Sequence, residues 1–390
     1  MTDPNTDSNG HLALVLAGGG ARAAYQVGVL AGIAERVGSD FRFPIVTGVS
    51  AGAINAAYLA SHAGPFGPTV DTLAHAWLSL SCGSVFRADA LPLLGGVCKW
   101  VASLLTGGVP AGVLDTRPLR ETLSRFMSRD GIDENLVSGR LRAFAVSTTS
   151  YATSKTVTFV QGASDIASWK RSGRIALQES ISEKHVLASS ALPLVFPAVS
   201  IGDEYFGDGS VRQTAPLAPA IHLGARRLLG ISVRYPTRDR TDAGLQVAGY
   251  PPPAQVLGML MNAIFLDAME ADAERLERIN RSLAALPQDH SHPDGLRQLQ
   301  LVVLRPSQNL GQLAAGLDRH LPAALRYMVR GLGSSKIKSQ DLLSYLLFER
   351  PYIERLLELG RKDALAQWDE IAPLLEPRSG LPGADPAARC

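Results

Sequence analysis

The first part of the chain alternates short apolar runs with glycine-rich turns and helical patterns. An apolar run at 12–17 ends in three glycines and precedes a helical pattern over about 21–37. A second β-rich run at 43–47 leads into Gly48-Val-Ser-Ala-Gly52, and an alanine-rich helical pattern follows at about 53–61. A strand, a glycine turn and a helix, occurring twice in succession, predict a parallel sheet covered by helices.

The later patterns add both strands and long helices to this α/β arrangement. Further strands are predicted at 141–147, 156–160, 226–233 and 299–304, the first two forming a hairpin. After three prolines at 251–253, apolar residues recur on one face of a long helical pattern that reaches about residue 283. Residues 311–376 also have a helical pattern. We therefore expect an α/β core followed by a mostly helical region.

Composition limits the classes of protein that fit this pattern. The chain has 390 residues, of which 46% are hydrophobic and 19% charged, so disorder over most of its length is excluded. The 38 basic and 36 acidic residues give a net charge of +2, which argues against a nucleic-acid binder. Three cysteines form no CxxC pair, and the polar N-terminus lacks a signal-peptide pattern. We expect a cytoplasmic protein with no membrane-spanning segment.

The segment Gly48–Gly52 fits the G-x-S-x-G pattern of a nucleophile elbow. A serine at a sharp turn between a strand and a helix takes a strained backbone conformation, and the flanking glycines remove side chains that would collide there. The predicted strand before Ser50 and helix after it supply this context. The pattern also fits a serine that only caps a helix. Ser50 is the first candidate nucleophile.

The glycine cluster Gly18-Gly19-Gly20, followed by Ala21 and Arg22, predicts a loop that binds an anion. Free backbone N–H groups in such a loop can hold a dinucleotide pyrophosphate or form an oxyanion hole. The dinucleotide pattern G-x-G-x-x-G has Ala23 at its last position, and Asp40 precedes the second strand instead of ending it. The oxyanion hole is therefore favoured.

A third feature is Asp208, which lies between Gly207 and Gly209. An aspartate between glycines is common in turns, and this segment alone predicts no more than a turn.

Together, these features resemble the patatin-like phospholipase family in their order along the chain. The four blocks that carry the resemblance are the glycine-rich loop continuing through 18–30, the elbow at 48–52, the segment 188–197, and Asp208 with the run 211–224. The similarity covers about residues 11–235. Two departures are Ala23, where a glycine is common, and Ser210, where the family often has a second glycine after the aspartate.

The resemblance implies a fold and a set of roles. The fold is a three-layer α/β/α arrangement with a mainly parallel central sheet and a helical C-terminal extension. Ser50 would be the nucleophile and Asp208 its base, in a dyad without histidine. Gly18, Gly19, Gly20 and Arg22 would form the oxyanion hole, Gly48 and Gly52 would shape the elbow, and Gly209 would shape the aspartate loop. The implied domains are a disordered tail at 1–10, a catalytic domain at 11–235, a helical region at 236–376 that packs on or extends the core, and a tail at 377–390.

The resemblance also implies an activity, namely hydrolysis of fatty-acyl esters in lipids or lysolipids through an acyl-enzyme. No cofactor and no metal would be required. Three alternatives stay open. The same serine could transfer the acyl group to an alcohol or thiol, His222 could complete a Ser50–Asp208–His222 triad, or the chain could be a catalytically silent lipid-binding module.

Two segments are candidates for peripheral contact with a membrane surface. Residues 91–105 are apolar apart from Lys99 and include Trp100, and residues 321–332 combine apolar residues with Arg326 and Arg330. Both also fit ordinary core helices. The sequence leaves the oligomeric state open.

Overall fold

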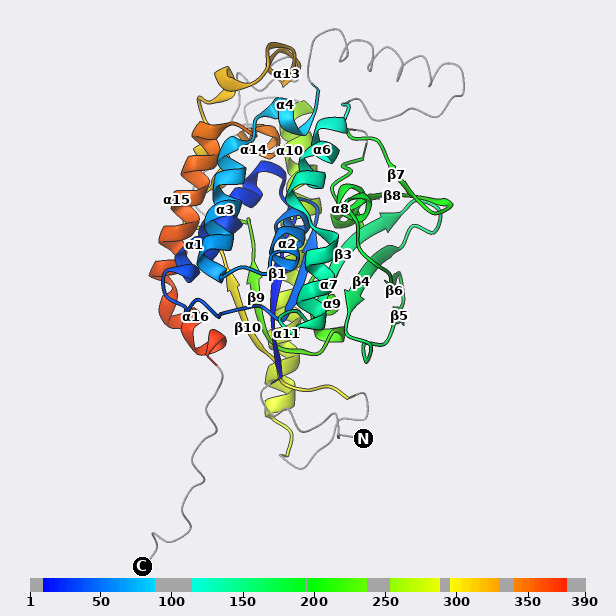
Figure 1. The fold of residues 1–390 in the computed structure, drawn as a ribbon. Helices are drawn as coiled ribbons and strands as arrows, with labels where there is room; N and C mark the ends of the chain where they lie inside the picture. Colours follow the sequence, from blue (N-terminus) through cyan, green and yellow to red (C-terminus); the bar gives the residue numbers. More distant parts are fainter. Residues whose placement is uncertain are drawn as a thin grey trace, which may run out of the picture.

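A computed structural model describes residues 10–87, 114–193, 195–236, 253–287, 295–329 and 340–376. Its centre is a mixed, mostly parallel sheet (Figure 1). The strands are β1 (His11–Leu16), β2 (Ile45–Val49), β3 (Ala143–Ser150), β4 (Thr156–Gly162), β5 (Lys170–Arg171), β6 (Arg174–Gln178), β7 (Val199–Ile201), β8 (Glu204–Asp208), β9 (Ala225–Ile231) and β10 (Gln300–Leu304).

The sheet has the order β10-β9-β1-β2-β3-β4-β6-β5, and its first five strands run parallel. The central strand β1 is almost fully buried because both faces of the sheet are covered. Its Leu14 and Leu16 face one core, and Ala13 and Val15 face the other. The predicted hairpin is confirmed, since β3 and β4 pair antiparallel.

One edge of β3 changes its partner part-way along the strand. From Ala143 to Ser147 it pairs in parallel with β2, whose last residue, Val49, lies opposite Ser147. From the next residue, Thr148, β3 pairs antiparallel with β8, beginning at Asp208. The C-terminal ends of β2 and β8 therefore meet head to head along one edge of β3.

Helices cover both faces of the sheet (Figure 1). They are α1 (Ala24–Ala34), α2 (Ala51–Ser61), α3 (Phe66–Ser79), α4 (Cys82–Val85), α6 (Arg117–Phe126), α7 (Arg129–Val137), α8 (Glu183–Ser189), α9 (Ala218–His222), α10 (Pro253–Phe265), α11 (Asp267–Ala284), α12 (Leu310–Leu313), α13 (Ala323–Val329), α14 (Gln340–Leu346), α15 (Arg350–Ala366) and α16 (Trp368–Leu375), with short 3₁₀ turns at Gly20–Ala23, Gly209–Val211 and Asp318–His320. The helices α1, α2, α8 and α15 pack on the larger core, and α9 and α11 on the smaller one. The expected three-layer α/β/α class is confirmed.

The C-terminal helices pack directly on the first helix of the chain. Glycines allow the close approach of α1 and α15. A Cβ atom added to Gly28 would collide with the backbone of Leu357, and one on Gly360 would collide with that of Tyr25. The strand β10 also extends the sheet beside β9. Residues beyond the α/β core thus complete both the sheet and its helical cover.

Several boundaries differ from those that the sequence predicts. The long helical pattern after the prolines is two helices, α10 and α11, separated at Leu266. The helix after the elbow begins at Ala51 and not at about residue 53, because the turn at Ser50 leads directly into the helix with no linking residue between them. The apolar segment 91–105 and the tail 377–390 lie outside the described residues, as does the tail at 1–10 except for Gly10. Among the described helices, none is long and apolar enough to cross a membrane.

Candidate active site

Ser50 lies in the sharp turn between β2 and α2, as the N-cap residue of that helix. Its backbone has φ 54° and ψ −132°, a conformation that residues with a side chain rarely adopt. Two glycines permit it, since a Cβ atom on Gly48 would collide with the start of α2, and one on Gly52 with the end of β1. The turn holds Ser50 at the positive end of the α2 dipole, where negative charge is stabilised.

A second serine supports this turn from α8. The backbone N–H of Ser50 donates a hydrogen bond of 2.9 Å to the hydroxyl of Ser189. That hydroxyl in turn donates one of 2.6 Å to the carbonyl of Ser147 on β3. Ser189 is fully buried, so no water competes for these bonds. The sequence alone assigned no role to this residue, because only the fold brings α8 against the elbow.

Asp208 ends β8 at the junction with β2 described above, and its backbone is fixed on both sides. Its N–H donates to the carbonyl of Ala191 at 2.9 Å, and its carbonyl accepts a 2.8 Å hydrogen bond from the hydroxyl of Thr149. A side chain on the next residue, Gly209, would collide with the backbone of Ser147. This close approach explains why a glycine follows the aspartate.

The Asp208 carboxyl group is buried, and one of its oxygens has little to bind. The Oδ1 atom accepts a 2.9 Å hydrogen bond from the N–H of Ser210, whereas Oδ2 makes no hydrogen bond of normal geometry within the described residues. Burial raises the pKa of this group from 3.8 to about 6. The nearby Ser50 hydroxyl and the Ser210 N–H and hydroxyl partly offset that rise in pKa. Such a carboxylate can accept a proton close to neutral pH.

The glycine loop between β1 and α1 runs directly past Ser50. A Cβ atom on Gly18 would lie 3.0 Å from the Cβ of Ser50, so only glycine allows this approach. The N–H groups of Gly18, Gly19 and Gly20 have no hydrogen-bond acceptor among the described residues. The loop therefore presents unused donors beside the serine, as an oxyanion hole requires.

The sequence led us to expect Arg22 in the oxyanion hole, but its side chain binds residues of α14. Its guanidinium group donates to the Ser344 hydroxyl at 2.7 Å, pairs with the Asp341 carboxylate at 2.8 Å, and lies 4.2 Å from the centre of the Tyr345 ring. Its backbone N–H donates to the carbonyl of Gly19. Arg22 thus ties the glycine loop to α14, and the three glycine N–H groups are the loop's available donors.

A largely apolar pocket opens beside Ser50 and Asp208, with about 750 Å³ of space that is partly open to solvent. Its walls come from α2, α3, α6, α10 and α14 and from the segment after α8. The aromatic and larger aliphatic residues that line it are Ile54, Trp77, Leu80, Val85, Leu119, Leu123, Phe126, Leu192, Phe196, Phe265, Tyr345, Leu346 and Phe348. The polar side chains in its lining are those of Ser50, Asp208 and Ser190, together with Thr122 of α6 and Tyr345 of α14.

His222 does not belong to this pocket. It ends α9, whose apolar residues pack in the smaller core on the face of the sheet opposite α2. Its ring stacks on Trp169 with centroids 4.8 Å apart. Burial lowers the pKa of His222, with a contribution from Arg171. The geometry therefore gives the Ser50–Asp208–His222 triad no support.

Comparison with known proteins agrees with the order of these features along the chain. A sequence model of the patatin-like phospholipase family matches residues 14–221, which include the glycine loop, the elbow and the aspartate loop. The chain belongs to the patatin-like phospholipase family. This membership supports a general activity as a lipid acyl hydrolase. None of the curated protein sequences compared with the chain matches it.

Among solved structures, this patatin-like phospholipase is similar to the crystal structure of VipD from Legionella pneumophila. The TM-score is 0.32 and the sequence identity 14%, over 89% of this chain and 67% of that chain.

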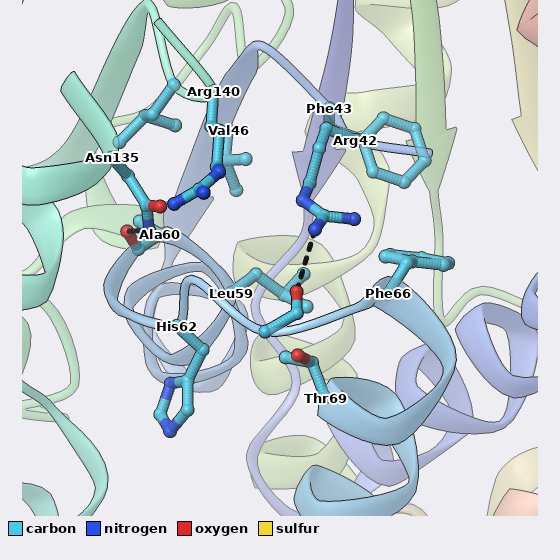
Figure 2. A pocket seen from close by; sticks show the side chains of 12 residues that line it. Arg42, Phe43, Val46, Leu59, Ala60, His62, Phe66, Thr69, Asn135 and Arg140 are labelled. Atoms are coloured by element: carbon cyan, nitrogen blue, oxygen red, sulfur yellow. Dashed lines mark hydrogen bonds between the residues drawn. The ribbon is translucent and has the colours of Figure 1, made fainter. Parts of the chain in front are cut away.

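A second pocket of this patatin-like phospholipase lies at the other end of α2 (Figure 2). It has about 440 Å³ of space and is lined by Leu59, Ala60 and His62 from the C-terminal end of α2 and just beyond it, together with Arg42, Arg140, Asn135 and several apolar residues. The guanidinium group of Arg42 donates to the carbonyls of Ser39, Phe41 and Gly64. Within the described ranges, no cluster of three or more His, Cys, Asp or Glu side chains could hold a metal ion.

Part of the candidate site lies outside the matched segment 14–221. Phe265 of α10 and Tyr345 and Leu346 of α14 line the pocket beside Ser50. The loop residue Gly20 also lies directly against α14. Its φ is +55°, and a Cβ atom added to it would collide with the backbone of Tyr345. The sequence pattern indicated helices in this region but carried no signal of where they pack.

Proposed function

We propose that this protein hydrolyses fatty-acyl esters of lipids through a Ser50–Asp208 dyad. The observation that carries the proposal is the meeting of β2 and β8 on one edge of β3, which brings both residues to the lining of one apolar pocket. A nucleophile and a base that come from distant parts of the chain, and that line one apolar pocket, are the minimum for acyl transfer.

In the first step, the Ser50 oxygen attacks the ester carbonyl carbon while its proton passes to the Asp208 carboxylate. Because the pKa of Asp208 is about 6, the group is ionised at neutral pH and is a stronger base than an exposed aspartate. The C–O bond to the leaving alcohol then breaks, and Asp208 returns the proton to that alcohol. The products of this step are an acyl-Ser50 ester and the free alcohol or lysolipid.

The second step repeats this chemistry with water. Asp208 takes a proton from the water molecule, which attacks the acyl-Ser50 carbonyl, and the fatty acid leaves as Ser50 regains its proton. In both steps, negative charge develops on the carbonyl oxygen. The N–H groups of Gly18, Gly19 and Gly20, which have no acceptor in the described part of the chain, and the N-terminus of α2 would stabilise that charge.

The apolar pocket supports a fatty-acyl chain as the part of the substrate that is held. Its described lining is mainly aliphatic and aromatic, and Asp208 is its one residue with an ionisable acidic or basic side chain other than Tyr345, so it contains no cation that would bind a phosphate. Burial of methylene groups in such a pocket contributes about 0.8 kcal/mol each to binding. The polar headgroup would then stay outside.

Mass spectrometry of lipid products tests this proposal. Purified full-length protein and its Ser50→Ala and Ser190→Ala variants are incubated with phospholipid and lysophospholipid in detergent, with and without an alcohol acceptor. We expect free fatty acid from the wild type and from Ser190→Ala, which removes another hydroxyl from the same pocket, and none from Ser50→Ala. Acyl-alcohol products would instead establish a transferase, and no product together with no fluorophosphonate labelling of Ser50 would establish a silent lipid-binding module.

A further inference from the structure

The helix α10 exposes an apolar face that no other part of the described chain covers. It contains no charged residue over its thirteen positions. Among the residues of α10 whose exposure the structure describes, the exposed ones are all apolar, namely Pro253, Val256, Leu257, Met259, Leu260 and Ala263. The side chain of Met259 is 64% exposed and that of Leu260 is 51% exposed. Such exposed positions on a helix are usually occupied by charged residues such as lysine and glutamate.

The adjoining helix shows what an ordinary surface helix of this protein looks like. On α11, which follows after Leu266, the buried face includes Met269 and Leu276, while charged residues such as Glu274, Arg275 and Arg278 are exposed. Its outer face is therefore compatible with water. The apolar outer face of α10 is a local feature and not a general property of the molecule.

The opposite side of α10 fixes the helix firmly to the candidate active site. Asn262 donates a 3.0 Å hydrogen bond to Asp341 and accepts one of 2.9 Å from the hydroxyl of Tyr345. One turn further, Phe265 ends the helix, lines the apolar pocket and lies against Gly18 of the glycine loop. The helix therefore runs from an exposed apolar face directly to the wall of the pocket beside Ser50.

Basic side chains lie at the same end of the molecule as α10. A third hollow, which is more polar, shares Thr122 of α6 with the apolar pocket. Its lining includes Arg87 and Arg125 together with one acid, Glu121. Figure 1 shows α4, α6 and α10 at one end of the fold, and α13, where Tyr327 is 81% exposed, lies at that end too. Apolar side chains flanked by arginines match the acyl and phosphate layers of a phospholipid bilayer.

We propose that the α10 face, defined as Val256, Leu257, Met259 and Leu260, is the surface by which this protein docks on phospholipid bilayers. The four side chains enter the boundary between headgroups and acyl chains, and the arginines of the neighbouring hollow lie at the level of the phosphates. An acyl chain leaving the bilayer then passes along α10 to Phe265 and the pocket. This last step rests on the proposed function, whereas the docking itself does not.

Vesicle flotation with the full chain tests the docking surface. The wild type, a Met259→Glu/Leu260→Glu variant and a Val137→Glu/Leu177→Glu control are mixed with vesicles of phosphatidylcholine, with and without phosphatidylglycerol. The control replaces two exposed apolar residues on α7 and β6, away from α10. We expect the α10 variant to bind about tenfold more weakly or worse, the control to bind as the wild type does, and phosphatidylglycerol to strengthen wild-type binding.

Two further measurements keep the result clear. Hydrolysis of a water-soluble short-chain ester reports the chemistry alone, and we expect it to be equal in all three proteins, which also shows that the α10 variant is folded. A Leu260→Trp variant should bind vesicles more tightly than the wild type, because tryptophan favours the interface. Equal vesicle binding by the wild type and the α10 variant would overturn the docking proposal, and so would a wild-type dimer that this variant dissociates. Vesicle binding through α10 without any ester hydrolysis would overturn the proposed function and leave the docking surface standing.

Discussion

The two ends of α2 carry two pockets of different size and different chemistry, with about 750 Å³ of space at the N-terminal end and about 440 Å³ at the C-terminal end. At the N-terminal end, the pocket combines apolar walls with a buried carboxylate and a strained serine, and beside the serine runs a glycine loop with three N–H groups that have no acceptor among the described residues. At the C-terminal end (Figure 2), Arg42 already donates to three backbone carbonyls, and none of the described residues that line the pocket is a carboxylate. One buried atom there, the Oδ1 of Asn135, also lacks a partner. The difference teaches that a hollow indicates chemistry only where several unsatisfied polar groups of complementary kinds converge.

The largest effect expected from this comparison follows replacement of Asp208 by asparagine. The amide keeps an oxygen for the N–H of Ser210 but cannot accept the proton of Ser50, so kcat/KM should fall by about 10²- to 10⁴-fold. The measurement is hydrolysis of a soluble ester and of phospholipid in detergent. An Asn135→Ala variant, at the other pocket, should retain the wild-type kcat/KM, and an equal loss in both variants would remove the distinction between the pockets.

The same substitution should stabilise the fold at neutral pH. The pKa of Asp208 in the folded protein, about 6, lies above its ordinary value of 3.8, so the folded state holds the proton more tightly than the unfolded state does. The wild type therefore loses stability as the pH rises from about 4 to 6, and a shift of this size corresponds to roughly 3 kcal/mol. Asp208→Asn should melt at a higher temperature than the wild type at pH 8, and the difference should vanish near pH 4. A lower melting temperature at pH 8 would contradict a buried ionised carboxylate.

The pH dependence of wild-type catalysis gives the next largest effect. Because the base must be ionised, kcat/KM should fall about tenfold for each pH unit below the pKa of Asp208, which is about 6. Above that pH, the profile should be flat through neutrality, since the described residues that line the pocket include no histidine. A soluble ester avoids changes in lipid ionisation during the measurement. A profile without an acidic limb between pH 5 and 7 would contradict the role of Asp208 as the base, whereas Arg42→Gln should leave the limb where it is.

A smaller effect should follow when each pocket is narrowed in turn. Leu123→Phe reduces the space of the apolar pocket, so the ratio of kcat/KM for long-chain to short-chain esters should fall by about tenfold, as expected for a lost fit of a few methylene groups. Leu59→Phe narrows the second pocket by the same change of side chain, and we expect the chain-length preference to stay as in the wild type. A shift in preference with Leu59→Phe would mean that the second pocket contacts the substrate.

The smallest effect belongs to Arg42 itself. Replacement by alanine removes its hydrogen bonds to the carbonyls around the end of α2, which should lower the free energy of unfolding by about 1–2 kcal/mol. Catalysis should be unchanged at a temperature well below the melting point. Thermal unfolding and ester hydrolysis, measured on the same preparation, check both halves of the expectation. Reduced kcat/KM with an unchanged melting temperature would give the second pocket a functional role.

Local patterns predicted much of the fold and the candidate nucleophile Ser50, whereas the role of Asp208 came only from the family resemblance. The apolar runs before the glycine clusters became β1 and β2, and the glycine spacing around Ser50 matched the turn that the structure contains, because both depend on neighbouring residues. The partner change on β3 was beyond prediction from these patterns. It depends on the pairing of β3 with β8, which is far away in the sequence and carries no local signal.

The contribution of the C-terminal helices was equally hidden from the sequence. A helical pattern at 311–376 indicates an apolar face but not what that face covers. The structure brings α14 onto the glycine loop through Arg22, whose position in the loop had suggested a role in the oxyanion hole. Burial and pairing of this arginine depend on Asp341 and Ser344, more than 300 residues later in the chain.

The partner change on β3 also decides when activity can appear during folding. Ser50 follows the end of β2 and Asp208 ends β8, two strands that approach from opposite directions, and only their shared pairing with β3 brings these two ends together. The connection that must close to bring β8 into place is long, and closing a long connection is entropically costly and slow. A chain with β1, β2 and α1 already packed thus has an elbow without a base. With the proposed dyad, ester hydrolysis would therefore report that β8 has joined β3, and a chain that lacks this pairing would be inactive.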